Sequence, residues 1–186
     1  MDQTALENAA RTAAAAAGIP AELFFGLIQT ESAWNPSAVS GAGAIGLTQV
    51  MPWWTTSLGI TLDQLRDPIQ NLTAGAKIFG DELAYFGDPA LAAMAYNAGR
   101  GAVNKAIAAA GSRDPATVSP HLSAAETRAY WQKVLTWASH YAGQIGAISA
   151  QVQATGEDIT ETASDNPIAT ALILVGLVGL AWLGMK

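Results

Sequence analysis

A glutamate on the apolar face of an expected helix is the residue best suited to do chemistry. In the stretch LFFGLIQTESAWNPSA, Leu23, Leu27 and Glu31 are spaced at i, i+4 and i+8, so all three share one helix face. A carboxylate in that position loses hydration, which favours its protonated form. A protonated carboxylic acid can donate a proton to a leaving oxygen and later accept one as a base. The spacing alone fits equally well a glutamate that accepts hydrogen bonds from loop amides at the helix end.

The composition excludes several other kinds of chemistry. The 186 residues contain no cysteine and only two histidines, which excludes thiol nucleophiles and disfavours a metal site or a catalytic triad built on histidine. No cofactor and no metal are therefore expected. A net charge of −6 disfavours nucleic acid as a partner, because phosphate binding needs clustered Lys and Arg. The run GAGAIG over 41–46 matches a dinucleotide-binding pattern, but no strand is expected before it, so we reject nucleotide binding.

Helix start and stop signals are frequent along the chain, and no alternating run of Val, Ile or Thr supports a substantial sheet. The fold class is therefore predicted to be predominantly α, with small strands at most. Asp63, Asp67 and Asp88 are interpreted as turn or cap residues. The expected helices cover approximately 2–17, 20–35, 47–58, 67–86, 88–97, 102–110 and 123–141. Residues 35–48 are glycine-rich and are expected to form a loop between the second and third of these helices.

The two ends of the chain differ in character. The N-terminus is expected to be a folded helix and not a secretory signal. Residues 144–166 are polar, small and acidic, which predicts a linker or an amphipathic helix without tertiary support. Residues 167–185 contain no charged side chain, and this length is close to the roughly 20 residues that cross a bilayer. A buried core helix is the alternative for 167–185. We predict a domain over 1–143, a linker over 144–166 and a transmembrane helix over 167–185.

Four motifs in order resemble the signature of the family 1 lytic transglycosylases, the muramidase relatives of goose-type lysozyme. They are ES at 31–32, GLTQ at 46–49, AYNAG at 95–99 and ETRAYWQKVL at 126–135, and the first two lie in one continuous match, ESAWNPSAVSGAGAIGLTQVMP. Each string alone is weak, but four in order over residues 31–135 are specific. The resemblance implies a lysozyme-like α+β fold, with helical lobes around a groove that holds a glycan strand of peptidoglycan.

The resemblance also implies a reaction. Glu31 would be the sole catalytic acid and base, protonating the oxygen between N-acetylmuramic acid and N-acetylglucosamine. It would then take the proton of the muramyl 6-hydroxyl, which closes onto C1 as a 1,6-anhydro ring without consuming water. The enzyme would thus be a glycan lyase. Two alternatives stay open: a hydrolytic, goose-type-like lysozyme that uses water, and a non-catalytic glycan-binding membrane scaffold.

Further site residues are carried over by motif from the same family. The substrate-binding positions would be Ser40, Gln49, Met51, Tyr96 and Asn97, and Tyr130 would orient the catalytic acid. Thr48 stands where the family often has Met, a small departure. Core packing is the alternative for Met51, Tyr96 and Tyr130, because such side chains at helical spacing are often core. Trp53 and Trp54 could stack on sugar rings, although at least one of them is expected in the core.

The expected partners are peptidoglycan glycan strands, a lipid membrane through the C-terminal helix, and other membrane proteins of a virion. Peptidoglycan lies outside the inner membrane, so the catalytic domain must be delivered from outside or translocated. We expect the virion membrane of a phage that opens the cell wall during infection. Otherwise we expect the bacterial inner membrane, with the domain facing the wall.

Overall fold

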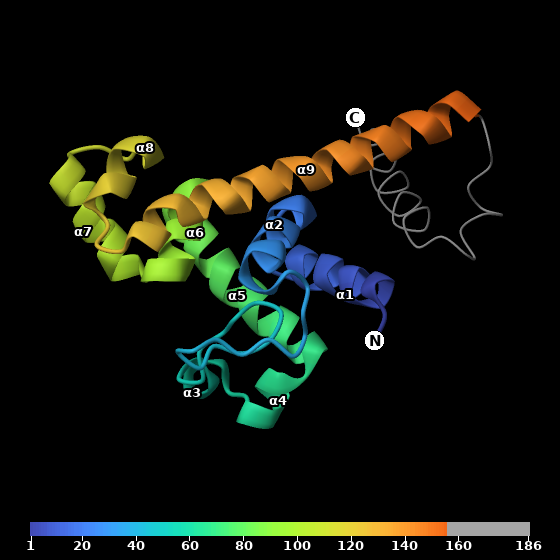
Figure 1. Cartoon of the computed structure of the whole chain (residues 1–186), viewed down its shortest axis with the longest axis horizontal. Helices are drawn as coiled ribbons and strands as arrows, with labels where there is room; N and C mark the ends of the chain where they lie inside the picture. Colours follow the sequence, from blue (N-terminus) through green and yellow to red (C-terminus); the bar gives the residue numbers. More distant parts are fainter. Residues whose placement is uncertain (156–186) are drawn as a thin grey trace, which may run out of the picture. The chain divides into compact units, whose positions relative to one another are not determined.

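The computed structural model describes residues 1–155, with the side chains of 126 and 146–155 excepted, and its regular elements there are all helical. Residues Met1–Tyr141 form one compact unit. The helices shown in Figure 1 are α1 (Gln3–Ala16), α2 (Ala21–Ser32), α3 (Trp54–Leu58), α4 (Leu62–Arg66), α5 (Pro68–Phe86), α6 (Pro89–Ala98), α7 (Arg100–Ala110), α8 (Pro115–Val118), the 3-10 turn η1 (Ser119–His121) and α9 (Ala125–Thr155).

The predicted α+β character is not found within residues 1–155, which are all-α. The loop between α2 and α3 holds only two isolated bridges, Val39 to Ile45 and Ile45 to Val50. The backbone turns too often here for a ladder, since Gly43, Gly46 and Gln49 have φ of 89°, 75° and 48°. A left-handed conformation at a residue bends the chain out of the extended form that a strand requires.

Helices α5 and α6 each begin with an aspartate cap followed by a proline. Asp67 Oδ1 accepts hydrogen bonds from the backbone N–H groups of Ile69 and Gln70, both at 3.0 Å. Asp88 caps α6 in the same way, and in each helix a proline occupies the first turn. The side chain satisfies backbone N–H groups that have no partner within the helix, and proline lacks the N–H that would otherwise need one. The interpretation of these two aspartates as caps is confirmed.

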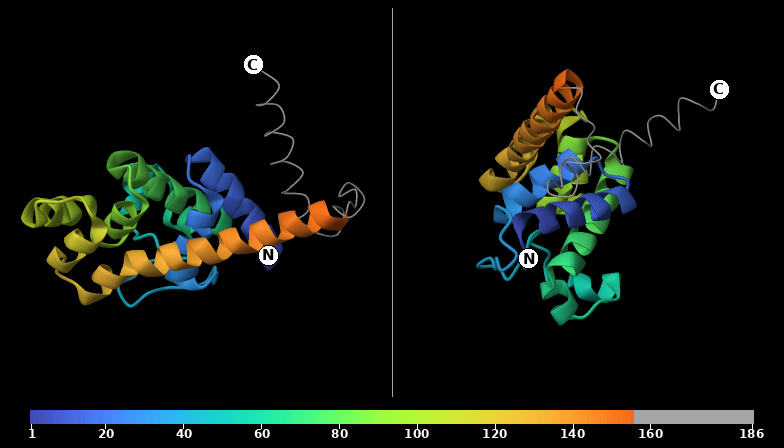
Figure 2. Two further views of the ribbon diagram at one scale, coloured as in Figure 1. Left: turned by 90° about the horizontal axis from the view of Figure 1, so that it is seen from above. Right: turned by 90° about the vertical axis from the view of Figure 1, so that its right-hand side faces the viewer.

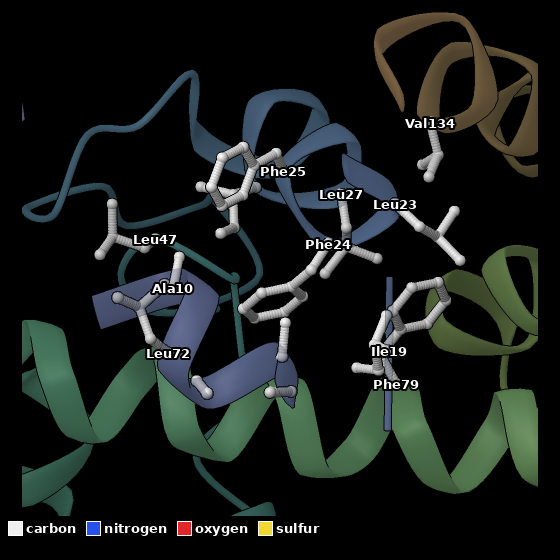
Figure 3. Close-up of a cluster of buried hydrophobic side chains, with 14 of the residues drawn as sticks. Ala10, Ile19, Leu23, Phe24, Phe25, Leu27, Leu47, Leu72, Phe79 and Val134 are labelled. Atoms are coloured by element: carbon white, nitrogen blue, oxygen red, sulfur yellow. The ribbon is translucent and has the colours of Figure 1, made fainter. Parts of the chain in front are cut away.

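The main hydrophobic core surrounds α2. Its residues Leu23 to Ile28 are all buried, and their neighbours come from α1, α5 and α9. Figure 3 shows Ala10, Phe24, Phe79 and Val134, one from each of these four helices, meeting in this cluster. The apolar stripe expected around Glu31 therefore packs against three other helices, which fixes the position of the helix that carries the glutamate.

A glycine allows α2 and α9 to pack closely. A Cβ atom at Gly26 would lie 2.4 Å from the carbonyl oxygen of Val134 and 2.8 Å from the backbone nitrogen of Ala138. Both atoms belong to the backbone of α9, so neither can rotate away. Gly26 is therefore the residue that sets how near these two helices come.

Helix α9 is longer than the sequence predicts. It continues to Thr155 as one long helix (Figure 2) and so includes the first part of the predicted linker over 144–166. The compact unit ends at Tyr141. The division into 1–143, 144–166 and 167–185 stays a prediction. The predicted transmembrane helix over 167–185 lies outside the described residues. Within residues 1–155, no helix combines the length and the apolar character that crossing a bilayer demands.

Candidate active site

Glu31 lies in the last turn of α2 and contacts a tyrosine of α9. The hydroxyl of Tyr130 donates a hydrogen bond to Glu31 Oε1 at 2.5 Å. Tyr130 is only 5% exposed, and Glu31 is partly buried. Ala33 and Trp34 have φ of 49° and 63°, so the helix ends at Ser32, one residue after the glutamate. The two residues that the sequence assigns to the acid and to its orientation are thus in contact.

A second set of contacts holds α9 against α2. The indole Nε1 of Trp34 donates to the hydroxyl of Tyr141 at 2.8 Å, and that hydroxyl donates to Gln29 Oε1 at 3.2 Å. The ring of Phe25 packs edge-on against Tyr141, with centroids 5.4 Å apart. Burial raises the pKa of Tyr141 from its ordinary value. Together with the close approach at Gly26, these contacts keep Tyr130 in place above Glu31.

The glycine-rich loop is fixed to α5 by a buried asparagine. The side-chain oxygen of Asn71 accepts from Thr48 N at 2.9 Å, and Thr48 Oγ1 lies 2.8 Å from the same oxygen. The amide nitrogen of Asn71 donates to the carbonyls of Ile45 and Leu65 at 2.8 and 3.1 Å. Thr48, at the position where the family resemblance expects Met, is therefore a structural residue. The fixed loop determines where Gln49 lies.

Tyr96 takes part in the same network. Its hydroxyl donates to the carbonyl oxygen of Thr48 at 2.7 Å. Burial raises the pKa of Tyr96, and the negative charge of Glu31 raises it further, while the hydrogen bond to Thr48 acts in the opposite direction. Tyr96 is thus close enough to Glu31 to feel its charge, and its hydroxyl already has a protein acceptor. Any contact of Tyr96 with a sugar would involve the ring more than the hydroxyl.

A cleft of about 710 Å³ contains four of the five predicted substrate-binding residues. These are Gln49, Met51, Tyr96 and Asn97. Among the described residues, the lining of this cleft includes neither Ser40 nor Glu31. One lining residue, Tyr96, is close enough to Glu31 for the charge of the glutamate to raise the pKa of the tyrosine. The volume is in the range of about 300–1,000 Å³ that is typical of ligand sites.

Ser40 and Gln49 both contribute to the loop itself. Ser40 Oγ accepts a hydrogen bond from Ala44 N at 3.0 Å and so stabilises a turn. The side-chain nitrogen of Gln49 donates to the carbonyls of Gly46 and Ala38 at 2.9 and 3.2 Å. These bonds orient the amide of Gln49 with its nitrogen toward the loop. The substrate contacts predicted for Ser40 and Gln49 stay predictions.

Asn97 has a partner that the sequence did not suggest. Thr127, a buried residue of α9, donates its hydroxyl to Asn97 Oδ1 at 2.7 Å. The motifs AYNAG and ETRAYWQKVL therefore touch each other, and α9 orients both Asn97 and Glu31. A threonine in the first turn of a helix gives no sequence signal for such a contact, because its partner lies 30 residues away.

Two acids in the cleft were also missed. Asp81 and Glu82 line it from α5, and Arg100 of α7 lies beside them. Arg100 Nε donates to Glu82 Oε2 at 2.9 Å, and Lys77 pairs with Asp81 at 3.1 Å. Glu82 follows the buried Ile78 by four residues, so the spacing argument that singled out Glu31 could have found it. Within residues 1–155, no group of three acidic or histidine side chains is placed to hold a metal ion.

The two adjacent tryptophans lie in the wall of the cleft. Trp53 is 68% exposed and Trp54 is 37% exposed. The expectation that at least one of them belongs to the core is wrong. Helix α3 has only five residues and buries none of them, so it offers no interior for an indole ring.

Some known proteins have sequences similar to this chain. Residues 8–119 match the family described as Transglycosylase SLT domain. The chain is 43% identical over 82 residues to a transglycosylase of Enterobacteria phage PRD1, and this match covers 44% of this chain and 30% of that protein. It is 32% identical over 133 residues to the soluble lytic murein transglycosylase of Escherichia coli K12, which covers 66% of this chain and 21% of that protein.

The fold has relatives among solved structures. The 70 kDa soluble lytic transglycosylase of Escherichia coli superposes with a TM-score of 0.68 at 28% identity, over 75% of this chain and 24% of that one. The chain thus spans less than a third of the length of each of these three relatives. The family match covers more than half of the chain and includes Glu31, the GLTQ loop and the AYNAG motif. The predicted resemblance is confirmed, and the chain belongs to the Transglycosylase SLT domain family.

Proposed function

We propose that this chain is a peptidoglycan lytic transglycosylase. It would cleave the β-1,4 bond from N-acetylmuramic acid to N-acetylglucosamine and leave a 1,6-anhydro ring on the muramyl residue. The observation that carries this proposal is the contact between Glu31 and Tyr130, a partly buried carboxylate held by a buried phenol. The proteins similar to this chain are transglycosylases by name, which agrees with this chemistry.

The proposed reaction needs one group that first gives and then takes a proton. Protonated Glu31 transfers its proton to the glycosidic oxygen as the bond from that oxygen to C1 of the muramyl residue breaks. The carboxylate then removes the proton of the 6-hydroxyl, whose oxygen forms the new bond to C1. The glutamate returns to its protonated form, so the cycle is complete without water. Tyr130 holds one carboxyl oxygen in a fixed direction throughout.

The charges in the cleft favour the lyase over the hydrolase. A hydrolytic glycosidase ordinarily uses a second carboxylate, either to activate water or to attack the sugar. Glu82 and Asp81 line the cleft, but their carboxylates contact Arg100 and Lys77 respectively. Each of these carboxylates already has a cationic partner, and Glu31 is not among the residues that line the cleft with them. Glu31 would therefore act alone.

The test is mass spectrometry of the products that the purified full chain releases from peptidoglycan sacculi. We expect 1,6-anhydro-muramyl ends with wild type, no products with Glu31→Gln, and normal products with Glu22→Gln, a matched change in the first turn of the same helix. Reducing muramyl ends would establish the hydrolase instead. Sacculi that stay intact while binding the wild-type chain would favour the non-catalytic scaffold.

The proposal extends to a membrane anchor. The uncharged composition of residues 167–185 supports insertion into a bilayer, and the similarity to a transglycosylase of a phage supports a phage origin. From these two observations we propose the virion membrane as the location of the chain. Flotation of the full chain with lipid vesicles tests the anchor. Leu177→Lys places a charge in the middle of the apolar run and should abolish flotation, since charged residues at that depth are costly. Proteomics of purified phage particles tests the location, and absence of the chain from them would refute it.

A further inference from the structure

We infer that the end of the cleft beside α3 is a binding subsite for an N-acetylated sugar ring, and that the indole of Trp53 stacks on that ring. Trp53, Trp54, Glu82 and Arg100 all line this cleft, and we assign these four residues to the subsite. This inference rests on the proposed function, because it assumes that the polymer in the cleft is a glycan. It adds residues that the family motifs do not include and gives the site a second contact region, away from Glu31.

The exposure of the tryptophans is the first observation. Trp53 leaves 68% of its surface in water and Trp54 leaves 37%, although both lie beside a cleft. Exposed aromatic surface of this size loses the stabilisation that burial would provide and commonly marks a binding site. An indole offers a flat apolar face, which matches the C–H face of a pyranose ring.

The backbone under the tryptophans is rigid. The N–H of Trp54 donates to the carbonyl of Met51 at 3.0 Å, and the N–H of Thr55 donates to that of Pro52 at 3.1 Å. The hydroxyl of Thr55 donates to the same Pro52 carbonyl at 2.8 Å. A ring presented from such a turn loses little backbone freedom when a ligand binds, which favours affinity.

Arg100 supplies a fixed polar surface in the same lining. Its Nε and Nη2 donate to the two carboxylate oxygens of Glu82 at 2.9 and 3.2 Å, and Nη2 lies 3.3 Å from the Asp81 carbonyl. The guanidinium stacks on the ring of Tyr85, 4.3 Å from its centroid. The hydrogen bond to Glu82 raises the pKa of Arg100, so it stays a cation. These contacts use Nε and Nη2, and the N–H groups of Nη1 are the ones suited to the oxygens of a sugar or its acetyl group.

The charge and the continuity of the cleft identify the occupant. Glu82 and Arg100 form a pair, so the subsite has little net charge and suits a neutral sugar. The residues assigned to the glycan by motif, Gln49, Met51, Tyr96 and Asn97, line the same cleft as Trp53, so one strand could contact both sets. Flat apolar rings beside planar polar groups are the combination that a saccharide requires, with stacking on one face and hydrogen bonds at the rim.

The experiment measures binding of a purified octasaccharide of alternating N-acetylglucosamine and N-acetylmuramic acid to the full chain carrying Glu31→Gln, by isothermal titration calorimetry. We expect Trp53→Ala to weaken binding about tenfold, from the size of a single aromatic stacking contact. Trp53→Phe should restore most of the affinity, because it keeps a flat ring. Trp137→Ala is the matched control, since Trp137 is 39% exposed but lies on α9 and outside the cleft lining.

A kinetic measurement separates a subsite from a structural role. In the chain with Glu31 intact, Trp53→Ala should raise KM for long strands about tenfold and leave kcat and the melting temperature unchanged. Equal affinity of the Trp53→Ala and Trp137→Ala chains for the octasaccharide would overturn the inference. Failure of the proposed function would give a different result. In that case the wild-type chain would release no anhydro-muramyl ends from sacculi.

Discussion

Gly26→Ala should inactivate the enzyme although it adds one methyl group far from any substrate atom. The new Cβ would lie 2.4 Å from the carbonyl oxygen of Val134 and 2.8 Å from the backbone nitrogen of Ala138. Normal contacts between such atoms exceed about 3.2 Å, so α2 and α9 must separate by roughly 1 Å. Tyr130 lies on α9 one turn before Val134, and Glu31 lies on α2, so their hydrogen bond would stretch by a similar amount.

The size of the effect follows from this displacement. Overpacking of this kind costs about 1–3 kcal/mol of stability, which a folded domain can survive. A misplacement of about 1 Å at a catalytic group can cost roughly 100-fold in rate. We therefore expect a modest fall in the melting temperature and a fall in kcat of about two orders of magnitude. KM should rise by a smaller factor, because α9 also holds Asn97 through Thr127.

The assay follows the release of anhydro-muramyl products from sacculi, with circular dichroism as the measure of folding. Gly143→Ala is the matched control, since Gly143 lies within α9 and a Cβ there meets no atom within 4 Å. That change should be neutral or slightly stabilising, because alanine favours the helix. Adding Ala138→Gly to Gly26→Ala should not restore activity, since the worst contact is with backbone. Full activity of the Gly26→Ala chain would refute the claim that this glycine sets the geometry of Glu31.

Three other changes test the remaining contacts of the site. Tyr130→Phe removes the hydrogen bond to Glu31 and should lower kcat about 10- to 100-fold, measured on sacculi, while a retained melting temperature shows that packing is intact. Asn71→Leu leaves the buried N–H of Thr48 without its acceptor and removes one hydrogen bond each from the carbonyls of Ile45 and Leu65, so it should lower the free energy of unfolding by roughly 3 kcal/mol, measured in urea. Burial and the charge of Glu31 raise the pKa of Tyr96 above 10.0, so above about pH 10 the unfolded chain releases this proton first and stability falls as the pH rises. Between pH 8 and 11, the urea midpoint of the Tyr96→Phe chain should fall less steeply with pH than the midpoint of wild type. Equal slopes for the two chains would contradict this account.

Local chemistry made much of the fold predictable. The helix that carries Glu31 follows from its apolar spacing, and the starts of α5 and α6 follow from an aspartate before a proline. These features depend on residues within one or two turns of each other, which is the range over which a single sequence is informative. The absence of an alternating pattern likewise predicted small strands at most, whereas the α+β expectation came from the family resemblance, and the loop holds only two isolated bridges.

Contacts between distant segments could not be derived in this way. A glycine inside a helix predicts a weaker helix, yet Gly26 is required here because the backbone of α9 passes so close. Tyr96 fits a sugar-binding motif, but its hydroxyl has an acceptor in Thr48, 48 residues away. At least one of Trp53 and Trp54 was expected in the core. Both are exposed, because α3 is too short to bury an indole ring.

These contacts between distant segments explain why Glu31 lies on an apolar helix face. The glutamate lies there because the helix that carries it must pack on three sides, and the same packing brings α9 close enough for Tyr130 to reach the carboxylate. Helix α9 also holds Asn97 through Thr127, so one helix orients both the acid and a residue of the cleft. A change that moves α9 should therefore reduce proton transfer and substrate binding together, whereas a change at Trp53 should reduce binding alone. This difference separates residues that place the site from residues that meet the substrate.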